Sequence, residues 1–162
     1  MKLTENFTLE ELTYSATAKR LGIDNTPSEA VLSKLKTLCK TVLQPIRKKY
    51  GKSVVVTCGY RCAKLNKVVG GASTSDHMYG NAADIRSVSD TKADNKALFD
   101  LILGMIKKKE IQVKQVIDEF GYDWIHVSYQ DGRSAKRNEV LEAFRDKNGK
   151  TVYRRISVLA GK

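Results

Sequence analysis

The chain has 162 residues and a formal net charge of +11, from 29 Lys and Arg against 18 Asp and Glu. An apolar fraction of 41% with only two prolines excludes a disordered chain, and no apolar run is long enough to insert into a membrane. The sequence predicts one domain over residues 1–162. Its basic residues are scattered, so charge alone does not choose between nucleic acid, a membrane surface and an anionic cell wall as the partner.

The start of the chain and its cysteines bear on its compartment. Met1 is followed by polar and acidic residues, without a basic segment leading into an apolar one. We therefore expect no signal peptide and synthesis in the cytoplasm. Cys39, Cys58 and Cys62 form an odd set without zinc-knuckle spacing. We interpret them as buried thiols.

Two capping boxes mark helix starts near the N-terminus, Thr8 with Glu11 and Thr26 with Glu29. The second has Pro27 at the first helical position. Apolar residues then recur at helical spacing as far as about residue 50. This pattern predicts one long amphipathic helix with a bend at its internal proline, residue 45.

The remaining elements alternate between strands, short helices and turns. Three consecutive valines predict a buried strand over residues 53–57, followed by a short helix that ends before Gly70 and Gly71. Residues 72–84 show neither the helical nor the strand spacing of apolar residues, and they lead into a strand at about 83–87. The expected elements after this point are a helix over 91–108 and strands over 115–120, 124–129, 140–145 and 151–156, the last two joined by an Asn148-Gly149 turn. Helices early and strands late predict an α+β fold with a mainly antiparallel sheet.

The chain has only two histidines, and both lie in unusual segments. His77 lies in the irregular polar stretch STSDHMYGNAADI, and His126 in the strand segment DWIHVSY. Asp84 follows His77 by seven residues, and a positive φ at Gly80 or Asn81 would let the segment fold back so that both side chains reach one ion. With His126 they would form a three-ligand zinc site whose fourth position is left for water, as in catalytic zinc sites. The alternatives are hydrogen-bonded structural histidines and a strand-capping aspartate.

A longer motif surrounds these candidate ligands. It resembles the S-x-H-x-x-G-x-A-x-D signature of the zinc D-Ala-D-Ala carboxypeptidase family, which includes vancomycin-resistance dipeptidases and phage L-alanyl-D-glutamate endopeptidases. The residues that match are Ser75, His77, Gly80, Ala82 and Asp84. The likeness extends upstream to Gly59-Tyr60-Arg61, with Cys58 where the family usually has serine, and downstream to Trp124, His126 and Ser128. It covers about residues 7–129 and is greatest to the short phage and prophage members.

The resemblance implies a Hedgehog/DD-peptidase-like fold and assigns roles by position. It implies that His77, Asp84 and His126 bind zinc and that Arg61 stabilises the substrate carbonyl as it becomes an oxyanion. The residues we expect to bind substrate or to orient the ligands are Ser75, Tyr60, Trp124 and Ser128. Trp124 has a second interpretation as a core residue.

Hydrolysis of an amide also needs a carboxylate that carries the proton of water to the leaving amine. The resemblance implies an acid three residues before the second histidine, which makes Asp123 the first candidate. Strand alternation would place Asp123 opposite His126, so we expect Asp123 to lie in the turn before the strand. Glu119 is the second candidate because related short members have an acid there, and Asp118 is the third.

The leading hypothesis is therefore a zinc peptidase that cuts peptidoglycan stem peptides, as a D,D-carboxypeptidase or an L,D-type endopeptidase. We expect a monomer that binds anionic wall polymers and acts at the wall or in the periplasm after release, if it is a phage lysin; a cytoplasmic recycling enzyme fits the sequence equally well. The alternative is a catalytically silent, metal-bearing binding module of the same fold. Specific nucleic-acid binding is not expected, because no recognition motif accompanies the charge.

Overall fold

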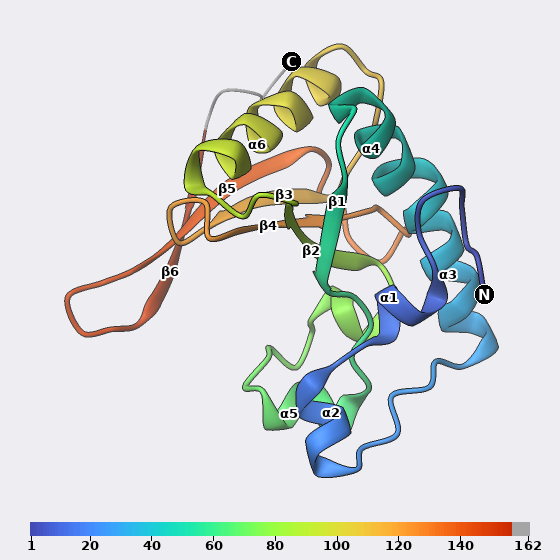
Figure 1. Cartoon of the computed structure of the whole chain (residues 1–162). Helices are drawn as coiled ribbons and strands as arrows, with labels where there is room; N and C mark the ends of the chain where they lie inside the picture. The colour runs from blue at the N-terminus through green and yellow to red at the C-terminus, as the bar shows by residue number, and fades with distance from the viewer. Residues whose placement is uncertain (157–162) are drawn as a thin grey trace.

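A six-stranded sheet crosses the computed structural model, which describes residues 1–156 (Figure 1). The last six residues of the expected domain lie outside the described ones. The strands are β1 (Val54–Cys58), β2 (Ala82–Ser87), β3 (Gln115–Glu119), β4 (Trp124–Ser128), β5 (Glu139–Arg145) and β6 (Thr151–Arg155). The helices are α1 (Leu9–Thr13), α2 (Ala16–Leu21), α3 (Glu29–Leu38), α4 (Gln44–Tyr50), α5 (Ala63–Val68) and α6 (Lys92–Lys107), with a π-helical turn η1 (Cys39–Leu43) and a 3₁₀ turn η2 (Asp76–Tyr79).

The strand order is β1-β2-β4-β3-β5-β6. Every neighbouring pair is antiparallel except β3 with β5, which are parallel. The predicted α+β fold with a mainly antiparallel sheet is confirmed. Among residues 1–156, no helix combines the length and the apolar character needed to cross a bilayer.

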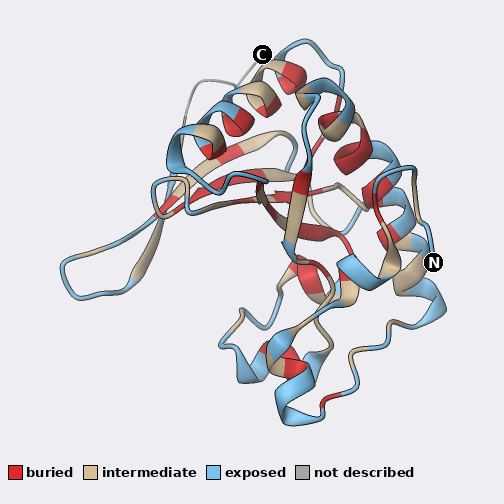
Figure 2. Ribbon diagram, in the orientation of Figure 1, coloured by how far each residue is buried: buried red, intermediate tan, exposed pale blue. Residues whose placement is uncertain are grey.

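The two faces of this sheet have different neighbours. Alternate residues of the central strands, such as Ile85, Ile125 and Val127, join α3, α4 and α6 in one apolar core. The buried residues in Figure 2 line the helix sides that face the sheet. The residues between them along each strand point to the opposite face. There η2, α2 and α5 lie under one end of the sheet, while the β5–β6 end projects beyond them (Figure 1).

The predicted long helix exists, but its start and its interior differ from expectation. It begins at Glu29 with Ser28 as the N-cap, so the capping box at Thr26 and the helical position of Pro27 are wrong. The Ser28 side chain accepts the N–H of Val31, which satisfies the first turn without Thr26. Near residue 45, where a bend is expected, the structure has the π-helical turn η1, which ends two residues before the proline that cannot donate to the preceding turn.

Several smaller expectations also have an outcome. The capping box of Thr8 and Glu11 is confirmed, although its helix has only five residues. Helix α2, capped by Ser15, was not predicted, and the stretch expected to be irregular contains η2. All three cysteines are free, but only Cys39 is buried, because Cys58 and Cys62 lie at strand and helix ends where part of the side chain remains accessible.

Candidate metal centre

Asp84 and His126 face each other on neighbouring strands. They are directly paired across β2 and β4, so their side chains leave the sheet on the same face. His77 reaches them from η2 because Gly80 ends that turn in the left-handed region at φ 74°. A Cβ at Gly80 would lie 2.9 Å from the carbonyl oxygen of Val31, so no side chain fits there. The expected fold-back at Gly80 is therefore present.

The imidazole of His77 is buried and fixed in orientation. Its Nδ1 lies 2.7 Å from the carbonyl oxygen of Gly59, which accepts the proton of this nitrogen. Gly59 is itself held against α1, where an added Cβ would lie 2.3 Å from the Leu12 carbonyl oxygen. The other nitrogen, Nε2, therefore faces Asp84, 3.4 Å from Oδ1.

The Asp84 carboxylate lies between the two imidazoles. Its Oδ1 is 3.1 Å from Nδ1 of His126, and the two rings are edge to face with centroids 5.1 Å apart. Burial by itself would raise the pKa of Asp84, but the charge of His77 and the hydrogen bond from His126 hold this pKa well below its usual value. Burial by itself would lower the pKa of His77, but the carboxylate of Asp84 raises it to about 10.

These spacings match the requirements of zinc. Two ligand atoms about 2.0–2.1 Å from a tetrahedral ion lie about 3.3–3.4 Å apart. The separations of 3.4 and 3.1 Å from Asp84 Oδ1 to the two histidine nitrogens are close to that length. Two imidazoles and a carboxylate are also a donor set that zinc favours. Asp84 and each of the two imidazoles are therefore spaced as two ligands of one zinc ion would be.

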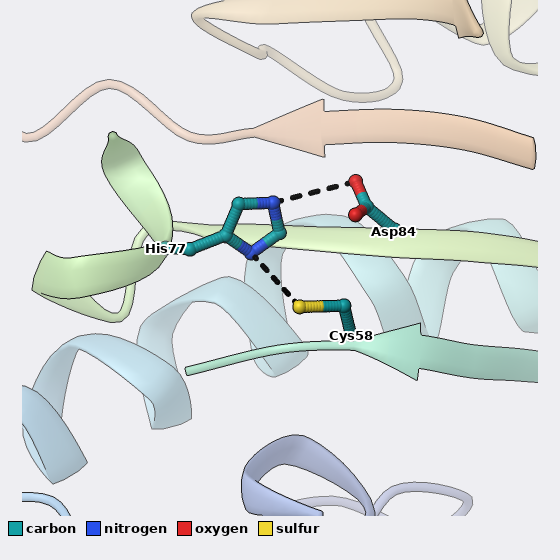
Figure 3. Close-up of side chains that lie close together, drawn as sticks. All are labelled: Cys58, His77 and Asp84. Carbon is teal, nitrogen blue, oxygen red and sulfur yellow. Dashed lines mark hydrogen bonds and ion pairs between the residues drawn. The ribbon is translucent and has the colours of Figure 1, made fainter. Parts of the chain in front are cut away.

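A second trio of donors overlaps the first. Within residues 1–156, Cys58, His77 and Asp84 each offer one donor atom within 4.8 Å of the others. However, Cys58 Sγ approaches Nδ1 of His77, at 3.9 Å, whereas Asp84 approaches Nε2. Figure 3 shows the thiol and the carboxylate at different nitrogens of the ring. In this arrangement the thiol lies on the Nδ1 side of the ring and the carboxylate on the Nε2 side, so the two trios place the ion differently around His77.

Arg61 lies beside the trio, at the start of the turn that leads into α5. Its side chain donates to Ser75 Oγ at 3.2 Å and to Cys58 Sγ at 3.7 Å. Ser75 also accepts the backbone N–H of His77 at 3.3 Å, and thus links Arg61 to η2. The Nε of Arg61 is buried and has no partner among the described residues. The bonds to Ser75 and Cys58 use two of the five N–H donors of the guanidinium.

The three candidate acids have different surroundings. Asp118 accepts the backbone N–H of Tyr122 at 2.6 Å and so closes the β3–β4 turn. Asp123 lies in that turn, as expected, where its half-exposed carboxylate forms a 2.7 Å ion pair with Lys92. Glu119 is only 7% exposed and is paired across the strands with Trp124.

Glu119 also lies on the face that carries the candidate ligands. It is two residues from Ile117, which is the direct partner of His126, and strand alternation places all three side chains on one face. Burial and the nearby charge of Asp84 raise the pKa of Glu119 to about 7. A carboxyl group of this kind can exchange a proton near neutral pH.

The other expected site residues are spread around this centre. Trp124 lies on the same face as His126, with its ring 5.4 Å from that of Phe120. Ser128 is fully buried, and its hydroxyl has no partner among residues 1–156. Tyr60 packs its ring against the main core, and its backbone N–H donates to the Leu12 carbonyl at 2.6 Å, so it supports the turn that carries Arg61.

Sequence reasoning missed an ion-pair network that fixes η2. Asp76, next to His77, is buried and forms ion pairs with Lys114 at 2.6 Å and with Arg133 at 2.9 Å. Arg133 also pairs with Asp131 at 2.6 Å. These partners come from distant parts of the chain, and only the position of Asp76 inside the motif could have pointed to them.

The sheet, the 3₁₀ turn and the three converging donors define a class of α+β proteins with a candidate metal centre on an open sheet face. The sequence model of the Peptidase M15 family matches residues 5–128. The chain therefore belongs to the peptidase M15 family, and the resemblance to zinc D-Ala-D-Ala carboxypeptidases is confirmed. Among curated proteins, no significant match to the chain was found. The family indicates a peptidase with a peptide substrate, and its members are typically zinc-dependent.

Proposed function

We propose that the chain is a zinc-dependent peptidase that hydrolyses an amide bond in peptidoglycan stem peptides. The observation that carries this proposal is the convergence of His77, Asp84 and His126 in a chain of the peptidase M15 family. We propose these three residues as the ligands and Zn²⁺ as the cofactor. When bound, zinc supplies a water molecule that ionises near neutral pH.

The residues of the chain hold the site ready for that chemistry. The Gly59 carbonyl keeps one proton of His77 on Nδ1, so that Nε2 is the nitrogen that would lose its proton and bind the ion. Asp84 contributes a carboxylate oxygen and a negative charge between the two imidazoles. His126 contributes Nδ1 from a central strand of the sheet, where the backbone is fixed on both sides.

Glu119 is proposed as the general base, ahead of Asp123. A carboxylate oxygen of Glu119 accepts a proton from the attacking water and delivers it to the nitrogen of the leaving amine. The pKa of about 7 suits both steps, because the group is partly ionised at neutral pH and its acid form still gives up the proton. The ion pair of Asp123 with Lys92 engages that carboxylate away from the candidate ligands.

Arg61 is proposed to bind the carbonyl oxygen of the scissile bond. Ser75 and Cys58 hold its two terminal nitrogens, and each of these nitrogens has a second N–H that can donate to substrate. A guanidinium placed at this oxygen stabilises the negative charge that develops during attack. Ser75 and Ser128 are proposed to position the site, and Tyr60 to hold Arg61 in place.

We further propose that the protein acts on the wall itself, as a monomeric phage or prophage lysin would. Its net charge of +11 would retain it on anionic wall polymers between cleavage events. No specific recognition of nucleic acid is needed for this role.

The decisive experiment is digestion of purified sacculi from several wall types. Released amines and muropeptide masses are measured for zinc-loaded protein, for chelator-treated protein and for a His126→Ala variant. New amines with the loaded protein alone support the proposal, and the muropeptide masses identify the bond. No new amine from any wall type would refute it.

A further inference from the structure

The last two strands lie outside the family match but inside the sheet that carries the site. The match ends at residue 128, whereas β5 and β6 span residues 139–155. Strand β5 pairs in parallel with β3, the strand of Glu119, and β6 pairs with β5. Figure 1 shows this β5–β6 hairpin projecting from the edge of the sheet. The hairpin therefore extends the sheet on the side of the proposed base.

Strand register places one aromatic residue of the hairpin in line with that base. Glu119 is paired with Ala143, and Ala143 is paired with Tyr153. On its other side, Glu119 is paired with Trp124. Directly paired residues share a face of the sheet, so Trp124, Glu119, Ala143 and Tyr153 form one row on the face of the metal centre. The next residue, Arg154, points to the other face, where it pairs with Glu142.

The side chains of this row differ in size and in exposure. Ala143 is 2% exposed and has the smallest side chain of the row. Tyr153 is 56% exposed, whereas Glu119 in the same row is 7% exposed. Partial burial and the charges of Glu119 and Asp84 raise the pKa of Tyr153, so its hydroxyl stays protonated next to the site.

We propose that the β5–β6 hairpin forms one wall of the substrate cleft and that Tyr153 is a substrate-positioning residue. Its ring packs against the stem peptide beside the scissile amide, opposite Trp124 across the proposed base. This inference rests on the proposed function and deepens it, because it assigns a substrate contact to a segment beyond the family match. The aromatic ring provides the contact, so phenylalanine replaces tyrosine with little loss.

The test compares three variants of the zinc-loaded protein on a synthetic stem pentapeptide that ends in D-Ala-D-Ala and contains the L-Ala-D-Glu bond. Tyr153→Ala should raise KM about tenfold with kcat little changed, because it removes contacts made equally in the ground and transition states. Tyr153→Phe should keep KM within about twofold of the wild-type value. Arg154→Ala, on the same strand but the other face, is the matched control and should leave both constants unchanged. Zinc content and melting temperature are measured for each variant to exclude misfolding.

Binding is measured separately through Trp124, the only tryptophan of the chain. The fluorescence of zinc-loaded Glu119→Gln protein is titrated with the same peptide, with and without Tyr153→Ala. If the wild type cleaves the peptide and Tyr153→Ala matches it in KM and binding, the proposed substrate contact of Tyr153 is wrong and the proposed function stands. If nothing is cleaved but Tyr153→Ala weakens binding about tenfold, hydrolysis is wrong and the cleft wall stands. If the peptide is neither bound nor cleaved, both proposals fail.

Discussion

The two faces of the sheet are built from the same strands but bury different kinds of side chain. On the face covered by helices, Ile85 and Ile125 join a continuous apolar core. On the other face, their chain neighbours Asp84 and His126 bring a carboxylate and an imidazole together. Apolar burial stabilises the fold wherever it occurs, whereas buried carboxylates cost free energy unless a partner offsets them. The helix-covered face therefore supports the fold, and the open face is where a cation would be bound.

Truncating two neighbouring residues whose side chains lie on opposite faces should affect metal binding in one case and stability in the other. His126→Ala should abolish zinc binding and lower kcat/KM by at least about a thousandfold, because a bound metal ion supplies several kcal/mol of transition-state stabilisation. Ile125→Ala should instead lower the free energy of unfolding by about 2–5 kcal/mol, because it leaves a cavity in the core. Zinc content, peptide cleavage and chemical denaturation distinguish the two effects. Full zinc content in His126→Ala protein would contradict the ligand assignment.

The next largest effect concerns the two acids that could serve as base. Glu119→Gln should lower kcat by about 10²–10⁴-fold while zinc content is retained, because the proton carrier is lost and the ligands are not. Asp123→Asn should change kcat by less than about threefold, since it removes a surface ion pair with Lys92. The reverse pattern would make Asp123 the base.

The raised pKa of Glu119 predicts a stability effect that needs no substrate. In the folded, metal-free protein this pKa is raised from 4.5 to about 7, so the folded state holds the proton more tightly than the unfolded chain does. Stability from this group is present below about pH 4.5 and is lost as the pH rises through about 7. Glu119→Gln should therefore gain about 3 kcal/mol relative to the wild type between pH 4.5 and pH 8. Urea unfolding in the presence of chelator measures the difference. The prediction is refuted if the free energies of unfolding of the wild type and of Glu119→Gln change equally with pH.

The sequence predicted those parts of the fold that local patterns determine. Helix α6 matches its expected range closely, and the strands agree within one or two residues, because apolar periodicity reflects burial directly. Boundary errors arose where two signals competed. Thr26 and Ser28 are both suitable caps, and the backbone of the folded chain uses Ser28. The short helix α2 has too few residues for a period to be visible.

The candidate site was predictable in part for a different reason. His77 and Asp84 lie within one motif, and Gly80 between them explains how they meet. The surroundings of the acids were not predictable, because they depend on contacts between distant segments. Asp123 and Lys92 are 31 residues apart in the chain, and only the tertiary fold brings them together. The register of Tyr153 against Glu119 is equally a property of the assembled sheet.

The smallest expected effect is that of a substitution at Cys58. It distinguishes the two overlapping sets of candidate ligands, one of which contains His126 and the other Cys58. Cys58 lies on the Nδ1 side of His77, whereas the proposed ion lies on the Nε2 side. Cys58→Ser should therefore change zinc affinity by less than about threefold, with Cys62→Ser as the control for loss of another half-buried thiol. Competition with a chelator of known affinity measures both. A loss of more than about a hundredfold in Cys58→Ser protein alone would exceed the effect of an outer contact and would make the thiol a ligand. His126 would then face the substrate, and the open face would hold its cation nearer to β1.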